Sequence, residues 1–423
     1  MSSRALNDVL ITGLGVVSPI GLNRQAIWQA IDSKTSGVAP WPEMAEARWM
    51  APYCGAVRNF DGKAFVKPRK SLKIMCPEMQ FASAAAELAW EDAGLDDRHV
   101  DPQRSGIVAA AAGEQFCHLE ELQASYLAWL REEPFNIHCW PKSAIDELFP
   151  LWLLKYLPNL NACHVGIRRD FRGPSNTISI GDPSSLQAVA EAAHVIHRGS
   201  ADLMLAGGSS SYLSATLTAF HAGARLAVSD RPPAEICRPF DRAHMGMVYG
   251  EGAAFFILES RAHATRRGAN AIGRVVAAAS RCEPSAFNCD YSGKSTAQAV
   301  RAVLHQADLE PNQIGHVNAH GNSTLEDDPA EAQAIQNTLG DVPVTAPKSF
   351  FGNLSQASGA VELAVSLIAL ERGVIPPTLN YENPDPACPV NVVTDVQPTE
   401  NRTFLALNHS PNGQAMALLV AEA

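Results

Sequence analysis

An alternation of short apolar runs with alanine-rich segments of helical spacing constrains this chain more than any other feature. Residues 9–21 begin as a buried strand and then turn through glycine, serine and proline, and we expect a helix from about Arg24. Residues 79–93 have helical spacing and end before Gly94, a residue that favours a helix stop. The alternation indicates α/β layers around a mostly parallel sheet.

The same alternation continues to the end of the chain. Residues 114–168 contain several tryptophans and prolines, and we expect helices and loops there that cover the core and line a partner surface. No glycine-, serine- or proline-rich linker separates independent units, so we expect two halves of similar element order, 1–265 and 266–423. The remaining strands are expected at 177–180, 203–206, 314–320, 342–346, 404–407 and 415–420, the last two as an antiparallel pair, and the remaining helices at 184–198, 330–339 and 358–371.

Charge and composition exclude several classes of function. The formal net charge of −11 argues against a nucleic-acid partner, although a local basic patch can still bind an acidic carrier protein. No apolar stretch reaches the ~18 residues of a membrane helix, and the N-terminus lacks a signal-peptide core, so we expect a cytoplasmic protein. The nine cysteines form no CxxC pairs, and no metal-ligand cluster or phosphate loop is present. We therefore expect no cofactor and no metal.

A set of short motifs, taken in order along the chain, carries a family resemblance. The motifs are Val9-Leu-Ile-Thr-Gly-Leu-Gly-Val-Val-Ser-Pro19, Ala206-Gly-Gly208, Arg238-Pro-Phe-Asp241, Gly250-Glu-Gly252, Val317-Asn-Ala-His-Gly-Asn-Ser-Thr324, Asp328-Pro-Ala-Glu331, Pro347-Lys-Ser349 and Ile375-Pro-Pro-Thr-Leu379. In this order the chain resembles the β-ketoacyl-acyl-carrier-protein synthases, the ketosynthases of fatty-acid and polyketide synthesis, over nearly its whole length. The resemblance implies the thiolase fold, five-layered α-β-α-β-α with duplicated βαβαβαββ halves. It also implies an acyl carrier protein bearing an acyl or malonyl thioester as partner, and a homodimer or a heterodimer with an active ketosynthase.

The resemblance fails at the nucleophile. The family motif Thr-Ala-Cys-Ala-Ser-Ser is matched here by Ile180-Gly-Asp-Pro-Ser-Ser185, so Asp182 stands where the acyl-accepting cysteine is expected. A carboxylate is a poor substitute, because its acyl adduct would be a mixed anhydride. Asp is a favoured N-cap and Pro a favoured first helical residue. We therefore favour a structural role for Asp182 and Pro183 as a helix start over a chemical role.

Other family positions are retained or changed nearby. His320 matches the first catalytic histidine, and Lys348 and Glu331 match the lysine and glutamate that pair in the family, where we expect them to hold the shape of the site. The segment that contains Phe351 ends in Asn353 instead of a second histidine. An asparagine side chain still donates hydrogen bonds to an enolate oxygen, so one interpretation is that the site keeps its decarboxylation chemistry. The other, equally open, is that Asn353 has drifted in a site no longer under chemical demand. We expect Phe351 to contact substrate.

The closing loop also departs from the family. Residues 408–416 lack the two gating phenylalanines, whose places are taken by Ser410 and Asn412. Pro411 fixes its own φ and stiffens a segment that is a mobile gate in the family. We expect His409, Ser410 and Asn412 to project polar groups into the substrate pocket.

These observations leave three hypotheses. The first, which we favour because nucleophile and gate are altered together, is a non-condensing partner subunit similar to the chain-length factors of type II polyketide systems. The second is altered chemistry, either decarboxylation of malonyl-carrier protein through His320 and Asn353 or acid/base catalysis by Asp182, whose carboxylate would raise the pKa of the neighbouring imidazole. The third is an ordinary condensing enzyme that uses Cys163 or Cys237.

Overall fold

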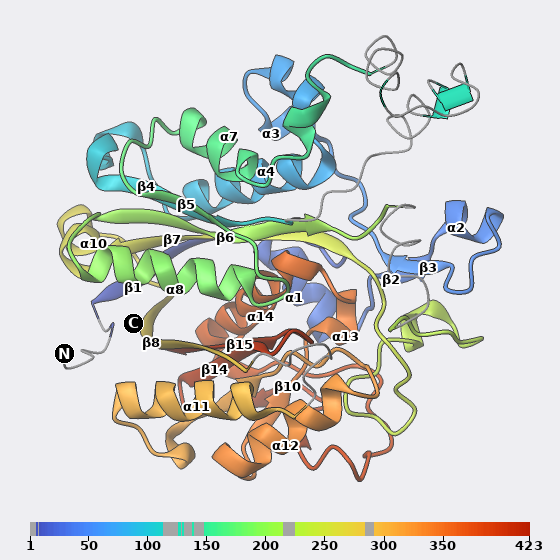
Figure 1. Ribbon diagram of the computed structural model, residues 1–423. Coiled ribbons are helices and arrows are strands. Elements are labelled where there is room, and N and C mark those ends of the chain that lie inside the picture. The colour runs from blue at the N-terminus through green and yellow to red at the C-terminus, as the bar shows by residue number, and fades with distance from the viewer. Residues whose placement is uncertain are drawn as a thin grey trace.

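Helices and strands alternate through the molecule in five layers (Figure 1). The computed structural model describes residue 6 and residues 8–112, 126–127, 129–130, 138, 148–214, 225–283 and 292–423. Outer helices α4 and α7 cover one sheet, helices α8 and α14 fill the space between the sheets, and α11 and α12 cover the second sheet (Figure 1). No helix among the described residues is long and apolar enough to cross a membrane.

The first half supplies one sheet with the order β1-β7-β6-β4-β5. Strands β4, β5 and β6 are parallel, whereas β7 is antiparallel to both β6 and β1. Its helices and strands are β1 (Val9–Val17), α1 (Arg24–Asp32), β2 (Val38–Pro40), α2 (Pro42–Glu46), β3 (Tyr53–Gly55), α3 (Gly62–Phe65), α4 (Pro77–Asp92), β4 (Ser105–Ala110), α7 (Leu160–Arg168), β5 (Ser175–Ile178), α8 (Ser184–His197), β6 (Leu203–Ser211), β7 (Glu251–Ser260) and α10 (Arg261–Arg267).

The second half repeats this order in the sheet β12-β10-β9-β14-β15-β8. The sheets are joined where β1 pairs with β8 at Val9–Ile11. Its helices and strands are β8 (Gly273–Cys282), α11 (Lys294–Ala307), β9 (His316–Asn318), α12 (Asp327–Leu339), β10 (Pro343–Thr345), α13 (Lys348–Phe351), α14 (Ser358–Arg372), β11 (Val374–Ile375), β12 (Asn391–Val392), β13 (Gln397–Pro398), β14 (Thr403–His409) and β15 (Gln414–Ala421).

The expected fold class is confirmed by this arrangement, since β1-α4-β4-α7-β5-α8-β6-β7 and β8-α11-β9-α12-β10-α14-β14-β15 have the same order. The expected boundary at 265/266 falls inside α10 and stays a prediction. The expected strand 314–320 is shorter, because β9 ends at Asn318 and leaves His320 in a loop. Of the segment 114–168, most of the first thirty residues lie outside the described residues, and the remainder forms the 3₁₀ turn η4 (Trp152–Lys155) and α7.

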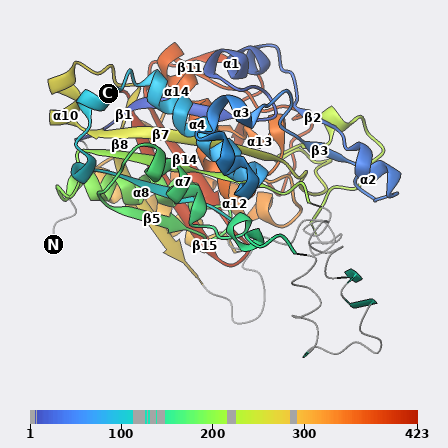
Figure 2. The ribbon, with the colours of Figure 1, turned by 90° about the horizontal axis from the view of Figure 1, so that it is seen from above.

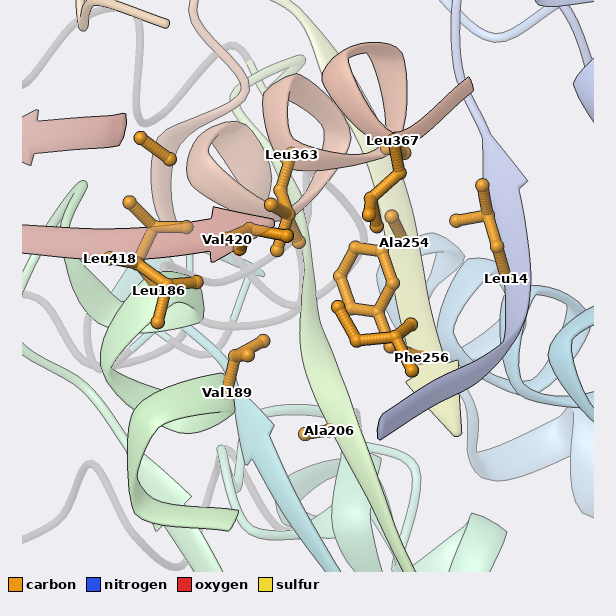
Figure 3. Close-up of a cluster of buried hydrophobic side chains, with 14 of the residues drawn as sticks. Leu14, Leu186, Val189, Ala206, Ala254, Phe256, Leu363, Leu367, Leu418 and Val420 are labelled. Carbon is orange, nitrogen blue, oxygen red and sulfur yellow. The ribbon is translucent and has the colours of Figure 1, made fainter. Parts of the chain in front are cut away.

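The central core lies around the inner helices, where α8 and α14 contact side chains of both sheets (Figure 3). Figure 2 shows the ribbon from above. Residues 358–370 of α14 are all buried, as expected for a helix enclosed on every side. Close packing elsewhere depends on glycine: a Cβ at Gly15 of β1 would lie 1.9 Å from the carbonyl oxygen of Ala85 in α4. The layers are thus packed too tightly to tolerate a side chain at this crossing.

A buried ionic cluster ties β7 to β1 and α10. Glu259 is fully buried, accepts a hydrogen bond from Arg267 Nε at 2.8 Å, and also contacts His263 and the hydroxyl of Thr12. Burial by itself would raise the pKa of this carboxyl, but the hydrogen bonds from Arg267, His263 and Thr12 outweigh it and lower the pKa to about 2. The cluster therefore holds an ionised carboxylate inside the protein.

Acid should weaken the protein through this cluster. Because the pKa of Glu259 falls from 4.5 to about 2 on folding, its stabilisation is present above pH ~4.5 and is lost as the pH falls towards ~2, by about 3 kcal/mol. His263, whose pKa is raised by Glu259, is protonated in both states over this range and adds no slope. Urea unfolding of the protein between pH 4.5 and 2 measures the loss. In Thr12→Val, which removes one hydrogen bond to the carboxylate, the loss of unfolding free energy should be smaller. If Glu259→Gln lost stability with pH as steeply as the wild type, the assignment to Glu259 would be contradicted.

Candidate active site

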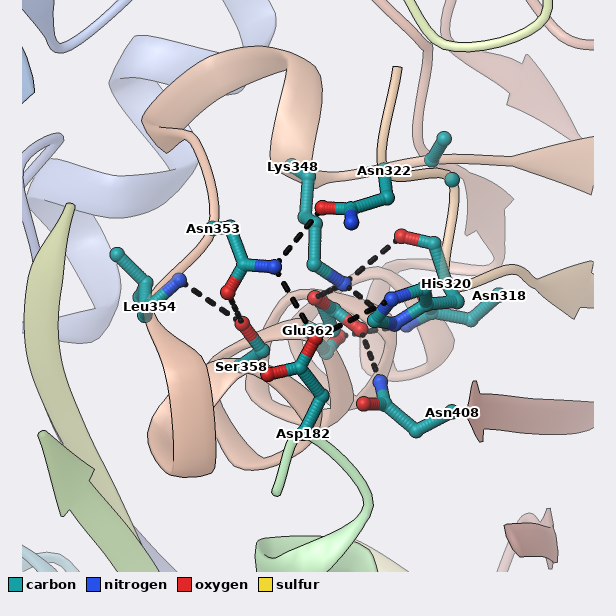
Figure 4. A network of polar contacts seen from close by, with 12 residues as sticks. Asp182, Asn318, His320, Asn322, Lys348, Asn353, Leu354, Ser358, Glu362 and Asn408 are labelled. Atoms are coloured by element: carbon teal, nitrogen blue, oxygen red, sulfur yellow. Dashed lines mark hydrogen bonds and ion pairs between the residues drawn. The ribbon is translucent and has the colours of Figure 1, made fainter. Parts of the chain in front are cut away.

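Loops from both halves bring a set of buried polar side chains together at the start of α8 (Figure 4). Asp182 precedes α8, His320 follows β9, Lys348 begins α13 and Asn353 follows it, and Glu362 lies on α14. All five residues are buried. The structure thus brings together four residues that the sequence analysis singled out, Asp182, His320, Lys348 and Asn353, with a glutamate that it did not.

The Asp182 carboxylate faces the other polar groups and does not cap α8. Its Oδ2 accepts a hydrogen bond from Asn353 Nδ2 at 3.1 Å and lies 3.4 Å from His320 Nε2. Pro183 occupies the N-cap position with φ −68° and ψ −7°, and no side chain caps the helix. The expected cap by Asp182 is therefore wrong, because the hydrogen bond to Asn353 takes its carboxylate away from the helix, whereas Pro183 does stand at the helix start as expected.

Asn353 has a fixed orientation. Its Oδ1 accepts from the backbone N–H of Ser355 at 2.6 Å, so its Nδ2 must be the donor to Asp182. Nδ2 also donates to Asn322 Oδ1 at 2.8 Å, and Asn322 in turn donates to Asp327 Oδ2 at 3.0 Å. Sequence reasoning missed the positioning role of Asn322, although it lies only two residues from His320 in the same motif.

The tautomer of His320 follows from Lys348. The Lys348 ammonium has only protons to donate, and its Nζ lies 3.0 Å from His320 Nδ1, so Nε2 carries the imidazole proton and directs it towards Asp182. Burial and then the charge of Lys348 hold the pKa of His320 well below its usual value. The expectation that Asp182 would raise this pKa is wrong, because burial and the nearer ammonium dominate.

Lys348 pairs with Glu362 and not, as expected, with Glu331. Glu331 instead accepts the backbone N–H groups of His320 at 2.7 Å and Gly321 at 2.8 Å, and so shapes the loop. Burial raises the pKa of Glu362 to about 7, with Lys348 opposing the shift and Asp182 adding to it. A signal for Glu362 existed in the sequence, because it is the one carboxylate within the otherwise uncharged residues 358–370.

The closing loop is a tight hairpin turn between β14 and β15. The Ser410 N–H donates to the Gln414 carbonyl at 2.8 Å, and Gly413, at φ +82°, donates to the Ser410 carbonyl at 3.0 Å. Asn412 is exposed, so the expectation that it projects into the pocket is wrong. Its place at the tip of the turn directs it to solvent, whereas Ser410 is buried.

His409 and Phe351 have different surroundings. The His409 ring lies 4.5 Å from that of His320, centroid to centroid, so it borders the polar cluster. Phe351 is wholly buried within the central hydrophobic core. The structure places Phe351 among packing residues, which corrects its expected role in substrate contact.

Neither candidate cysteine joins the cluster. Cys163 is exposed on α7 in an outer layer. Cys237 is buried and its Sγ–H donates to the Lys348 carbonyl at 3.2 Å, and burial, reinforced by Asp328, raises the pKa of this thiol to about 12. A thiol held in this form is a poor nucleophile. Neither of the two cysteines named in the third hypothesis therefore lies in the polar cluster.

The cluster has the geometry of an anion-stabilising site that already contains an anion. His320 Nε2–H and Asn353 Nδ2–H converge on one oxygen of Asp182. Two donors aimed at one point are the arrangement that stabilises an enolate or another developing negative charge. Because the Asp182 carboxylate occupies that point, a second anion there would meet like-charge repulsion.

Removing the charge of Asp182 should lower the pKa of Glu362. In the wild type we expect Glu362 to titrate near pH 7. In Asp182→Asn the pKa should fall, because one neighbouring negative charge is gone. Carboxyl ¹³C NMR titration measures it, with Glu362→Gln identifying the resonance and Asp170→Asn, on the exposed surface, as control. A Glu362 titration that is identical in wild type and Asp182→Asn would show that the two carboxyls do not interact.

Comparison with known proteins agrees with this geometry. Residues 6–264 match the family described as "Beta-ketoacyl synthase, N-terminal domain" and residues 272–382 match "Beta-ketoacyl synthase, C-terminal domain". The chain is 31% identical over 421 residues, 98% of this chain and 97% of the relative, to the oxytetracycline polyketide putative beta-ketoacyl synthase 1 of Streptomyces rimosus. It is also 31% identical to 3-oxoacyl-[acyl-carrier-protein] synthase 2 of Coxiella burnetii, covering 91% of each chain.

A solved structure shares both fold and sequence. It is AntDE:AntF, a type II polyketide synthase acyl-carrier protein in complex with its ketosynthase, and it matches with a TM-score of 0.84 and 26% identity over 99% of each chain. The overall fold of the chain agrees with this match. The chain therefore belongs to the β-ketoacyl synthase family of fatty-acid and type II polyketide biosynthesis.

Proposed function

We propose that this protein is a non-condensing subunit that pairs with a cysteine-bearing ketosynthase, in the manner of a chain-length factor. The observation that carries the proposal is the Asp182 carboxylate, which accepts from Asn353 at the point where His320 also converges. A carboxylate there offers no stable acyl adduct. It also occupies the donors that would stabilise the enolate formed when a malonyl thioester loses carbon dioxide.

The space around Asp182 supports a subunit without its own acyl chemistry. Five of the best-defined cavities in the described part of the chain are lined by residues other than Asp182, His320 and Asn353. One of them borders His409 but has a volume of about 10 Å³, far too small for an acyl chain. None of these five cavities brings an acyl-sized space to the polar cluster in the described part of the chain.

The free edge of the first sheet offers a surface for a partner of the same fold. Among the described residues, β5 is the last strand of its sheet. The carbonyls of Pro174, which precedes β5, and of Ile178 accept from N–H groups of β4 and the residue that follows β4. Alternate residues of a parallel strand bond to the same side, so Ser175 presents its peptide groups to the open edge.

Exposed apolar side chains lie on α7, which packs on β5, and on the η4 segment that precedes α7. Helix α7 packs on β5 and carries Ile167, which is 81% exposed. Phe149, Leu151 and Leu153, in and before η4, are also exposed. Exposed peptide groups next to exposed apolar side chains are typical of a protein–protein interface. We propose a ketosynthase subunit as the partner that binds there.

A basic segment supports an acidic carrier protein as a further partner. Residues 63–73 form part of α3 and the 3₁₀ turn η1 (Arg69–Ile74), and all their cationic side chains are exposed. None of these side chains forms an ion pair with another residue in the part of the chain that the structure covers. The cationic residues are Lys63, Lys67, Arg69, Lys70 and Lys73. On a chain of net charge −11, such an unneutralised patch favours an acidic partner.

Pairing is tested by co-expression with a cysteine-bearing ketosynthase from the same genome, followed by native mass spectrometry. We expect a 1:1 complex for the wild type and for Ser175→Ala, which keeps the peptide N–H. Ser175→Pro removes that N–H from the open edge without touching the β4 ladder, so the chain should fold but bind at least ~10-fold more weakly. Circular dichroism checks that Ser175→Pro is folded.

Two results would contradict the proposal. One is a stable homodimer that ignores every such ketosynthase. The other is carbon dioxide release from malonyl-carrier protein that His320→Ala abolishes, which would favour a decarboxylase that works despite Asp182.

A further inference from the structure

A small polar cavity lies where three elements meet beside the proposed active site. They are the N-terminus of α11, the first turns of α12 and the β14–β15 hairpin. The cavity has a volume of about 10 Å³. It is lined by Gly293, Ser295, Thr296, Asp327, Ala330, Glu331, His409 and Ser410, six of which carry polar side chains.

Two side-chain atoms of the lining have no protein partner. His409 is 8% exposed and Ser410 6%, yet the Nε2 of the first and the Oγ of the second form no hydrogen bond with any described residue. Leaving such a group unsatisfied costs about 1–3 kcal/mol. Both atoms belong to residues of one small cavity, so a single polar occupant can satisfy them together.

The other walls of the cavity supply both hydrogen-bond donors and hydrogen-bond acceptors. Helix α11 begins after Gly293, which has no side chain to cap it, and Ser295 and Thr296 of its first turn are buried. Helix N-termini direct peptide N–H groups outward. On the opposite side Glu331 Oε2 lies 3.8 Å from His409 Nε2, too far for a direct hydrogen bond, and a gap of this kind suits a bridging molecule.

The size of the cavity and the charges around it determine which molecule it can hold. A volume of about 10 Å³ is near the lower limit for one water molecule and excludes carboxylate or phosphate ions. The positive end of α11 and the imidazole of His409 disfavour a metal cation, despite the carboxylates of Asp327 and Glu331. Water both donates and accepts, so it suits a lining that contains a helix N-terminus, a hydroxyl, an imidazole and a carboxylate.

We infer that one ordered water molecule binds in this cavity and latches the Ser410–Gly413 turn to α11 and α12. The latch fixes the hairpin over the start of α8, where a Cβ on Gly181 would lie 3.6 Å from Ser410 Cβ. The turn is then a permanent cover over Asp182 and not a gate that opens for acyl groups. The binding of the water does not depend on the proposed function. The role of the turn as a permanent cover rests on the proposed non-condensing function.

Hydrogen exchange of the isolated full-length chain tests the latch. Ser410→Ala removes the hydroxyl that faces the water, and Asn412→Ala alters an exposed residue of the same turn that does not line the cavity. We expect amide exchange in peptides covering residues 408–416 to be about 2- to 10-fold faster in Ser410→Ala, as the loss of one hydrogen bond implies, and unchanged in Asn412→Ala.

A crystal structure of the wild type gives the second readout. We expect one water within hydrogen-bond distance of both His409 Nε2 and Ser410 Oγ. An empty cavity, a metal ion coordinated by Asp327 and Glu331, or equal exchange rates in wild type and Ser410→Ala would each overturn the latch. No ketosynthase is present in either experiment, so these outcomes are independent of whether the chain pairs with one.

Discussion

Close packing of α8 against α14 is the constraint on which the rest of the structure depends. A Cβ at Gly359 would lie 2.7 Å from Leu186 Cγ, and the Ser185 hydroxyl accepts from the Ala360 N–H at 2.9 Å. The inner helices of the two halves therefore touch at their first turns. Because Asp182 directly precedes one helix and Asn353 lies shortly before the other, this contact sets the distance between them.

The electrostatics of this junction explain how a buried aspartate is accommodated just before α8. The start of a helix favours negative charge, and two further donors, from His320 and Asn353, point to the same oxygen. The buried cation of the cluster, Lys348, pairs separately with Glu362 on α14.

The alternation of strands and helices predicted α/β layers, and the ordered motifs, through the family resemblance, predicted the fold class. The same motifs located Asp182, His320, Lys348 and Asn353, which the structure brings together. The pairings were harder to predict. Asp182 has strong local capping propensity, but its actual partner is 171 residues away, and Lys348 pairs with Glu362 on α14 and not with the motif glutamate Glu331. Such contacts are decided by how the layers pack, which periodicity does not encode.

The central claim is that the family's acyl-transfer chemistry has been lost from this chain while its fold still serves a catalytic partner. Intact-mass measurement of both subunits of the purified complex, after incubation with an acyl-carrier protein, tests it most directly. The account predicts one acyl group on the cysteine-bearing ketosynthase and none on this chain. An acyl adduct on this chain, at Asp182 or at any cysteine, would contradict it.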